Sequence, residues 1–310
     1  MRSQHLDQAP RHLVRPAAGA AYLTPGGWAA GARGYRRWDV IGEATGAVHT
    51  GFAICELDPG GSLPAHAHSF EETFYVLDGE AAVISAESSA RVSPGDYGLI
   101  PVGVPHMWRN DSGRPVRWAQ MQGPQPRRRF GDDTFLVPFD APSAARPVDV
   151  RDPRTRGYGN ITPSHMDPRR QSQELLAVSA SMRTALLVYS GITVKMMADS
   201  DLGAQLTTMF MVSYDPEGKA GAHDHPFEET YLILEGATHA VFDDQMYLLQ
   251  AGDIAWAGVG CTHSFTNAGD GPVRWLETQA PQPPARYSYR FARDWEYLSD
   301  LLDRNGEAHG

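Results

Sequence analysis

"AHAHSFEETFYVLDGEA", residues 65–81, places His66 and His68 one residue apart and follows them with Glu72 and an apolar run that ends in a glycine. The valine, leucine and aromatic residues of this run predict a β-strand, in which alternate side chains face the same side. If the strand is continuous, His66, His68, Phe70 and Glu72 share one face. Imidazoles and carboxylates are costly to bury without partners, so this face requires an explanation.

The stretch has a second copy in the chain. "DPGGSLPAHAHSFEETFYVLDG" from residue 58 matches "DPEGKAGAHDHPFEETYLILEG" from residue 215, an offset of 223 − 66 = 157. The same offset relates His106 to His263 and the "PVRW" at 115 to the "PVRW" at 272. Solenoid repeats have much shorter periods, so this one indicates a duplicated domain.

Both copies contain short runs rich in β-branched and aromatic residues, separated by Asp-Pro, Pro-Gly and Gly-Asp turns. This pattern is typical of β-sandwiches and barrels, and it predicts an all-β fold of two tandem barrels. Helical periodicity is scarce; residues 170–188 and 292–306 show it best, and we expect the second of these helices to pack outside a barrel. The predicted parts are an N-terminal arm (1–33), a first barrel (34–135), a linker that crosses between the domains (136–180), and a second barrel with a C-terminal helix (181–310).

Composition excludes several classes of function. The 310 residues carry a formal net charge of −10, which argues against a nucleic-acid partner. No stretch approaches the ~20 consecutive apolar residues of a membrane span, and the N-terminus lacks the pattern of an export signal. Cys55 and Cys261 are too few for a disulfide framework or a thiolate zinc site, and we expect both to be buried. We expect a cytoplasmic protein that forms a homodimer or a larger homo-oligomer and has no membrane partner.

A further histidine in each copy completes a set of metal-binding groups. His106 follows a Gly-Asp turn, a strand and a Pro-x-Gly turn, and inward faces of neighbouring strands lie within side-chain reach in a small barrel. Three imidazoles and a carboxylate suit a divalent transition metal, iron or manganese first and nickel, cobalt or zinc as alternatives, and leave about two of six positions open. We expect one ion per barrel, bound by His66, His68, Glu72 and His106 in the first and by His223, His225, Glu229 and His263 in the second. Glu71 and Glu228 point to the opposite face, where we expect solvent.

Two motifs resemble those of the cupin superfamily. They are Gly60-x5-His66-x-His68-x3-Glu72-x6-Gly79 and Gly95-x5-Pro101-x-Gly103-x2-His106-x3-Asn110. The resemblance implies a bicupin, with two jelly-roll barrels that each hold a metal through three histidines and one glutamate. In the second copy Glu217 replaces the first glycine of the first motif and Gly258 replaces the proline of the second. Both departures affect turns and leave the metal-binding positions intact.

The whole-chain layout is also similar to the ureidoglycine aminohydrolases, bicupins of purine degradation that bind manganese in the C-terminal barrel. The similar segments are "AYLTPGG", "GYGN" and "LLQAGDIAWAGVGCTHSF". That family has glutamate at the place of His223, histidine at those of His225 and Glu229, and glutamine at that of His263. Only His225 carries over unchanged, so the resemblance bears on architecture and leaves the substrate open.

Three classes of function remain open. The favoured one is a metal-dependent oxygenase of the dioxygenase type that acts on a small polar organic substrate. The alternative is hydrolysis, deamination or isomerisation with the ion as a Lewis acid, as in the aminohydrolases, and the third is a non-catalytic binding protein. We expect the chemistry at the second metal centre. Residues expected to contact substrate are Tyr231, Ile233, Phe265, Trp256, Arg274 and Gln279 in the second copy and Phe74, Trp108 and Arg117 in the first.

Overall fold

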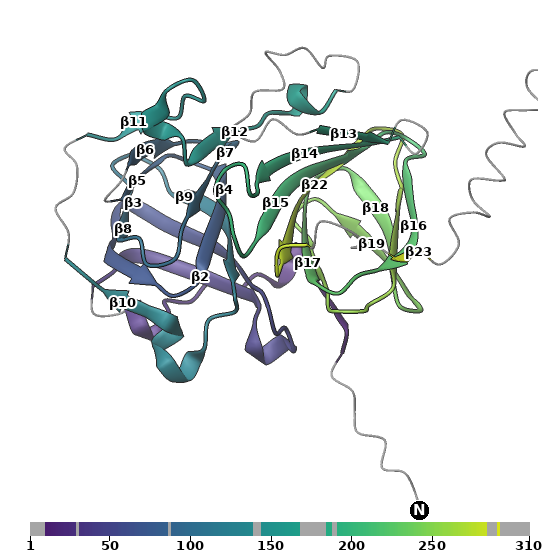
Figure 1. Ribbon diagram of the computed structural model, residues 1–310, viewed down its shortest axis with the longest axis horizontal. Coiled ribbons are helices and arrows are strands. Elements are labelled where there is room, and N and C mark those ends of the chain that lie inside the picture. Colours follow the sequence, from purple (N-terminus) through teal and green to yellow (C-terminus); the bar gives the residue numbers. More distant parts are fainter. Residues whose placement is uncertain are drawn as a thin grey trace, which may run out of the picture.

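The fold consists of two β-barrels that lie side by side (Figure 1), so the predicted all-β, two-barrel architecture is confirmed. The computed structural model describes residues 10–28, 31–85, 88–138, 144–167, 184–187, 191–283 and 290–291. The expected helices at 170–188 and 292–306 fall mainly outside these residues, apart from a short strand at Thr184–Leu187. In the described part of the chain, no helix is long and apolar enough to cross a membrane.

The first barrel is built on one large sheet, with strand order β11-β6-β5-β8-β3-β9-β4-β7-β12 and with β2 and β10 paired to β3. Its longest strand, β3, is bent around the barrel and contributes to several pairings. The strands are β2 (Arg33–Ile41), β3 (Gly51–His68), β4 (Glu71–Asp78), β5 (Ala81–Ser85), β6 (Ser89–Val92), β7 (Asp96–Ile100), β8 (His106–Arg109), β9 (Val116–Gly123), β10 (Thr134–Leu136), β11 (Arg146–Pro147) and β12 (Tyr158–Asn160).

The second barrel is built on two sheets, with orders β1-β20-β17-β22-β15-β14-β13 and β19-β18-β21-β16-β23. Its strands are β1 (His12–Arg15), β13 (Thr184–Leu187), β14 (Ile192–Ala198), β15 (Thr208–Tyr214), β16 (Lys219–Asp224), β17 (Glu228–Glu235), β18 (Ala237–Phe242), β19 (Gln245–Gln250), β20 (Ile254–Ala257), β21 (His263–Asn267), β22 (Val273–Ala280) and β23 (Arg290–Phe291). The helices in the described residues are short 3-10 helices: η1 (Ala17–Gly19), η2 (Gly26–Trp28), η3 (Glu43–Thr45), η4 (Arg128–Asp133), η5 (Pro153–Thr155) and η6 (Pro163–Met166).

In each copy, the strand after the metal-binding motif is followed by a glycine at a position that only glycine can occupy without strain. Gly79 has φ 77° and Gly236 has φ 73°, a region that favours glycine. A Cβ at Gly79 would lie 2.2 Å from the carbonyl oxygen of Pro115, and one at Gly236 would lie 2.6 Å from that of Pro272. The repeated glycine therefore permits a close backbone approach in both barrels.

The faces that the barrels turn toward each other form a continuous apolar core. It joins first-barrel residues such as Trp38 and Met121 to second-barrel residues such as Met209 and Trp256. Glu71 and Glu228 lie in this contact, and each is only 2% exposed. The expectation that these two glutamates face solvent is therefore wrong, because the outer face of their strands is covered by the other barrel.

The segments outside the two copies extend the barrels. β1 of the N-terminal arm pairs with β20, so the arm adds a strand to the second barrel. β10 and β12 pair with β3 and β7 of the first barrel, respectively. The segment predicted as a linker from residue 136 thus contributes strands to the sheet that carries the first candidate metal centre.

Candidate metal centres

The first candidate centre lies where β3, β4 and β8 meet. β3 ends at His68 and β4 begins at Glu71, so the two strands are separated by a bend rather than forming the continuous strand expected from the sequence. The ligands still converge, because β3 pairs with β8 and places His66 opposite His106. The His66 and His106 rings have centroids 4.0 Å apart.

Backbone carbonyls orient the three imidazoles of the first centre. The carbonyl oxygens of Pro64, Phe70 and Val104 each lie 2.6–3.0 Å from an Nδ1. A donating Nδ1–H fixes the tautomer in which Nε2 is left with a lone pair, which is the form that binds metals. The histidines in these contacts, in the same order, are His66, His68 and His106.

Several buried atoms directed into the first centre are not fully satisfied by the described residues. His106 Nε2 and Glu72 Oε1 make no hydrogen bond, and His68 Nε2 lies 3.4 Å from Glu72 Oε2. Ligand atoms of these three residues all lie within 4.8 Å of one another, and His66 adjoins them through its ring contact with His106. Buried polar atoms without partners are costly, and a cation would satisfy all of them. The residues present therefore fit a divalent metal ion.

The pKa shifts in the first centre favour its metal-binding protonation states. Burial, reinforced by the neighbouring His106, lowers the pKa of His66 to about 3. Burial also lowers the pKa of His106 to about 4. Burial alone would raise the pKa of Glu72, but the hydrogen bond and charge of His68 outweigh it and lower the pKa to about 2. Neutral imidazoles and an ionised carboxylate are the forms that bind metals.

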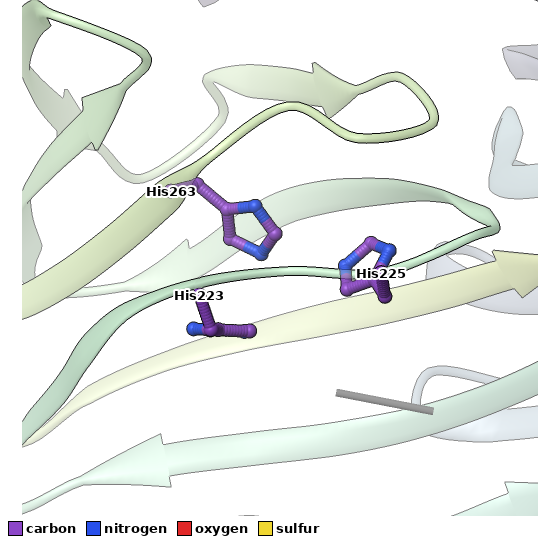
Figure 2. Close-up of side chains that lie close together, drawn as sticks. All are labelled: His223, His225 and His263. Atoms are coloured by element: carbon purple, nitrogen blue, oxygen red, sulfur yellow. The ribbon is translucent and has the colours of Figure 1, made fainter. Parts of the chain in front are cut away.

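The second candidate centre repeats this arrangement. Figure 2 shows the rings of His223, His225 and His263 directed toward one another from neighbouring strands, and their ligand atoms lie within 4.8 Å of one another. The Nδ1 atoms of these residues lie 2.8–2.9 Å from the carbonyl oxygens of Gly221, Phe227 and Cys261, respectively. Burial, with His263 nearby, lowers the pKa of His223 to about 4.

Glu229 has a more crowded position than Glu72. Its Oε2 lies 2.7 Å from His225 Nε2 and 3.3 Å from His263 Nε2, and it also accepts a hydrogen bond from the Tyr231 hydroxyl. Its Oε1 accepts from Gln279 Nε2 at 2.6 Å. Both carboxylate oxygens of Glu229 are therefore engaged, whereas Glu72 keeps Oε1 without a hydrogen bond.

A second acid lies beside Glu229. Glu277 is buried on β22, and its Oε2 accepts from Trp275 Nε1 at 2.9 Å. Burial and the adjacent charge of Glu229 raise the pKa of Glu277 well above its usual value. The position equivalent to Glu277 in the first copy is Gln120, whose Nε2 donates to Glu72 Oε2. The two centres therefore differ in a polar residue that touches the metal-binding carboxylate.

A small cavity adjoins the first centre. Its volume is about 20 Å³. A water molecule needs about 10–15 Å³ by the same measure, so the cavity has room for one or two water-sized groups. It is lined by Trp28, Tyr35, Arg37, Leu63, His66, His68, Phe70, Glu72, Trp108, Trp118, Gln120, Gln122, Asp132 and Thr134.

Sequence reasoning missed two polar residues of this cavity, Tyr35 and Arg37. The Tyr35 hydroxyl lies 3.3 Å from the buried Cys55 Sγ, which donates to Gln120 Oε1 at 3.0 Å. Arg37 Nη2 donates to Gln122 Oε1 at 2.7 Å. Strand alternation places Tyr35 and Arg37 on one face, and that signal in the stretch "GYRRWDV" could have pointed to them. They were overlooked because the second copy has no polar residue at either position.

Six of the predicted substrate contacts lie inside the barrels. Trp108 lines the first cavity, and Phe74 packs against it at 4.9 Å between ring centroids. Tyr231 and Gln279 contact Glu229, and Phe265 lies 4.7 Å from the Tyr231 ring. Ile233 belongs to the apolar interior of the second barrel.

Three predicted contacts are wrong, and alternation along the strands explains each of them. Arg117 is exposed, because Trp118 and Gln120 occupy the inward face of β9. Arg274 pairs with Glu235 at 3.2 Å on the outer face of β22. Trp256 lies in the core between the barrels, whereas its neighbours on β20 face the interior of the second barrel.

The sequence pattern of the cupin domain matches the chain twice, over residues 53–121 and 210–278. These matches include all eight residues of the two centres. The chain is a bicupin of the cupin superfamily. Both copies of the domain have thus kept a full set of metal-binding residues.

Solved structures of other bicupins share this fold. The oxalate decarboxylase of Lactobacillus farciminis in complex with formate is 17% identical, with a TM-score of 0.61 over 94% of this chain and 93% of that chain. A variant of the oxalate decarboxylase of Bacillus subtilis is 14% identical, with a TM-score of 0.62 over 91% of this bicupin and 80% of that protein. Another structure of the Bacillus protein is described by its Mn(II) centres. At these identities the likeness establishes the fold alone.

One curated protein matches part of the sequence. The endoribonuclease YbeY of Myxococcus xanthus is 32% identical over 117 residues, which are 34% of this bicupin and 40% of that protein. The chain therefore spans well under half the length of this relative.

Proposed function

We propose that this bicupin is a divalent-metal-dependent enzyme of the oxygenase type that acts on a small polar organic molecule. The observation that carries the proposal is the convergence of buried metal-binding atoms in the first centre, from His68, Glu72 and His106, which lie within 4.8 Å of one another. A bound divalent transition ion would supply about two open positions at which dioxygen and a chelating substrate could meet. The small cavity beside this centre has room for one or two water-sized groups, so a chelating substrate enters only if the walls move.

The residues of the chain would orient the ligands and exclude bulk water. Phe70 stacks on His68 with ring centroids 4.0 Å apart, and Phe227 stacks on His225 at the same distance. The metal-binding histidines are nearly inaccessible to solvent. Rigid, dry surroundings hold a metal centre in one geometry and protect a reactive step from water.

Hydrolysis or isomerisation is a second candidate, and one observation in the second barrel favours it. Glu277 lies against Glu229, and the Tyr231 hydroxyl donates to the same carboxylate. Reactions of this class need a positioned group that gives or takes a proton beside the ion. Glu277 is such a group, whereas the equivalent Gln120 of the first barrel does not titrate.

Nitric oxide is a suitable probe for the oxygenase proposal, because it occupies the positions that dioxygen would use. We expect the iron-loaded chain to bind nitric oxide with a new paramagnetic signal. The double variant His68→Ala with His225→Ala should lose the signal, and the control His239→Ala, whose histidine is exposed, should keep it. Failure of the iron-loaded chain to bind nitric oxide would contradict the oxygenase proposal.

The two candidate reactions also differ in their products. Oxygen uptake by the iron-loaded chain with a hydroxy acid or a catechol supports the oxygenase. Release of ammonia from an amino or ureido acid by the manganese-loaded chain, without oxygen uptake, supports the hydrolase. A Glu277→Gln variant should abolish only the second activity.

A further inference from the structure

Arg37 is the one arginine or lysine that lines the cavity of the first centre in the described part of the chain. It lies on β2, and its side chain is 13% exposed. It shares the cavity wall with His66, His68 and Glu72. Tyr35, two residues earlier on the same face of the strand, also lines the cavity, so the inward direction of Arg37 follows from strand alternation.

The contacts of Arg37 tie its guanidinium to the strand next to the one that carries the metal-binding carboxylate. Its Nη2 donates to Gln122 Oε1 at 2.7 Å, and Gln122 is the strand partner of Glu72 in the pairing of β4 with β9. Its Nε lies 2.6 Å from Asp39 Oδ1. Asp39 is 54% exposed, so water screens its charge more than it screens the charge of Arg37.

The second barrel lacks the positive charge at the position equivalent to Arg37. With the offset of 157 residues, Arg37 corresponds to Val194 and Gln120 corresponds to Glu277. The first cavity therefore has a buried cation where the second barrel has an apolar side chain. The second centre has an additional acid where the first has an amide. An anionic ligand is therefore favoured in the first barrel over the second.

We propose that the first barrel binds the carboxylate of its substrate through Arg37, and that the substrate class is a small hydroxy- or keto-carboxylate. This inference deepens the proposed function and rests on it for the role of the ion. A planar guanidinium is suited to a carboxylate because it offers several donors in a fixed geometry. The hydroxyl or keto oxygen would lie toward the metal-binding atoms.

The size and the remaining polar lining of the cavity restrict the substrate further. A volume of about 20 Å³ holds one or two water-sized groups, so only the smallest carboxylates can enter, and they do so with movement of the walls. Asp132, on the segment η4 that covers the cavity, also lines it and is half-buried. Its carboxylate could accept a hydrogen bond from a substrate hydroxyl, but it would repel a second carboxylate. A monocarboxylate with a hydroxyl or keto group is thus favoured over a dicarboxylate.

Binding of glycolate and of its uncharged counterpart glycolamide tests the inference. Dissociation constants are measured by titration calorimetry on the metal-loaded full chain and on the metal-free chain. We expect the wild type to bind glycolate more tightly than glycolamide. Arg37→Gln should weaken glycolate binding by about tenfold or more and leave glycolamide binding unchanged.

Arg36→Gln is the matched control. Arg36 is the preceding residue on β2, and it pairs with Glu56 and Asp58 on the opposite face. This variant should bind both probes as the wild type does. Arg37→Lys should bind glycolate with an intermediate affinity, because it keeps the charge and loses the planar donor geometry. Metal content and melting temperature are measured for each variant.

The outcomes separate the two proposals. Equal glycolate affinity in Arg37→Gln and Arg36→Gln would overturn the role of Arg37. A second result would also overturn it. If Arg37→Gln lost its metal and bound neither probe, and Arg37→Lys restored neither property, Arg37 would only support the fold of the centre. Absence of metal from the wild type would defeat the proposed function. In that case, the carboxylate site would still be supported if the metal-free chain preferred glycolate to glycolamide and lost this preference in Arg37→Gln.

Discussion

Glu71 and Glu228 make equivalent hydrogen bonds across the contact between the barrels, each to the backbone of the other barrel. The Glu71 carboxylate accepts hydrogen bonds from the backbone N–H groups of residues 205–207 of the second barrel. The Glu228 carboxylate accepts from the N–H groups of residues 48–50 of the first. The two glutamates are related by the offset of 157 residues, and so are the two sets of backbone N–H groups. The two halves of the contact are therefore related by pseudo-twofold symmetry. The duplication therefore preserved the interface together with the metal sites.

Replacement of Glu71 or Glu228 by glutamine should destabilise the two-barrel unit. Each substitution places an amide N–H₂ against backbone N–H donors that the carboxylate now satisfies, and we expect a loss of about 1–3 kcal/mol in the free energy of unfolding. Chemical denaturation of Glu71→Gln and Glu228→Gln measures it. Glu80→Gln, at an exposed glutamate, is the control. If Glu71→Gln and Glu80→Gln had equal stability, the hydrogen bonds of Glu71 to the other barrel would contribute nothing to stability.

Lys195 should make stability depend on alkaline pH. It is 0% exposed, its Nζ has no hydrogen-bond partner among the described residues, and burial lowers its pKa to about 8. Between this value and the usual 10.5, the unfolded chain holds a proton that the folded chain has released. The free energy of unfolding should therefore rise with pH across this window. Below the window, the full destabilisation from burying the charged amine remains.

Lys195→Met removes the buried amine and should flatten that rise. At pH 7 we expect the variant to be more stable than the wild type by about 1–3 kcal/mol. Urea unfolding at several pH values measures the difference, with Lys219→Met at a half-buried lysine as the control. Parallel pH profiles for the wild type and Lys195→Met would contradict this prediction.

Trp28 should control access to the first metal centre. Its ring packs edge-on against His66 with centroids 4.6 Å apart, and it lines the cavity. Trp28→Ala opens this wall, so a chelator should extract the metal faster. The His225→Ala background confines the measurement to the first centre. Leu23→Ala changes a highly exposed residue of the same N-terminal segment and should leave the rate unchanged. Equal extraction rates in the Trp28 and Leu23 variants would show that Trp28 is not part of the barrier.

The sequence pointed to the candidate metal ligands because the duplication repeats each of them at one offset. Residues that occur in only one copy left no such signal, and Arg37 and Glu277 were missed for that reason. Strand alternation also says which residues share a face, but it does not say what covers that face. Glu71 and Glu228 were therefore assigned to solvent, although the other barrel covers them. The same alternation, read over the whole of β9 and β22, would have placed Arg117 and Arg274 outside.

The metal content of four purified proteins tests the central claim most directly. Elemental analysis of chains prepared without chelators should find about two transition ions in the wild type and in His239→Ala, and about one in each of His68→Ala and His225→Ala. That pattern is predicted because each alanine removes an Nε2 ligand from one barrel and leaves the other intact. A wild type without stoichiometric metal, or single variants that retain the full content, would contradict the assignment of a metal centre to each barrel.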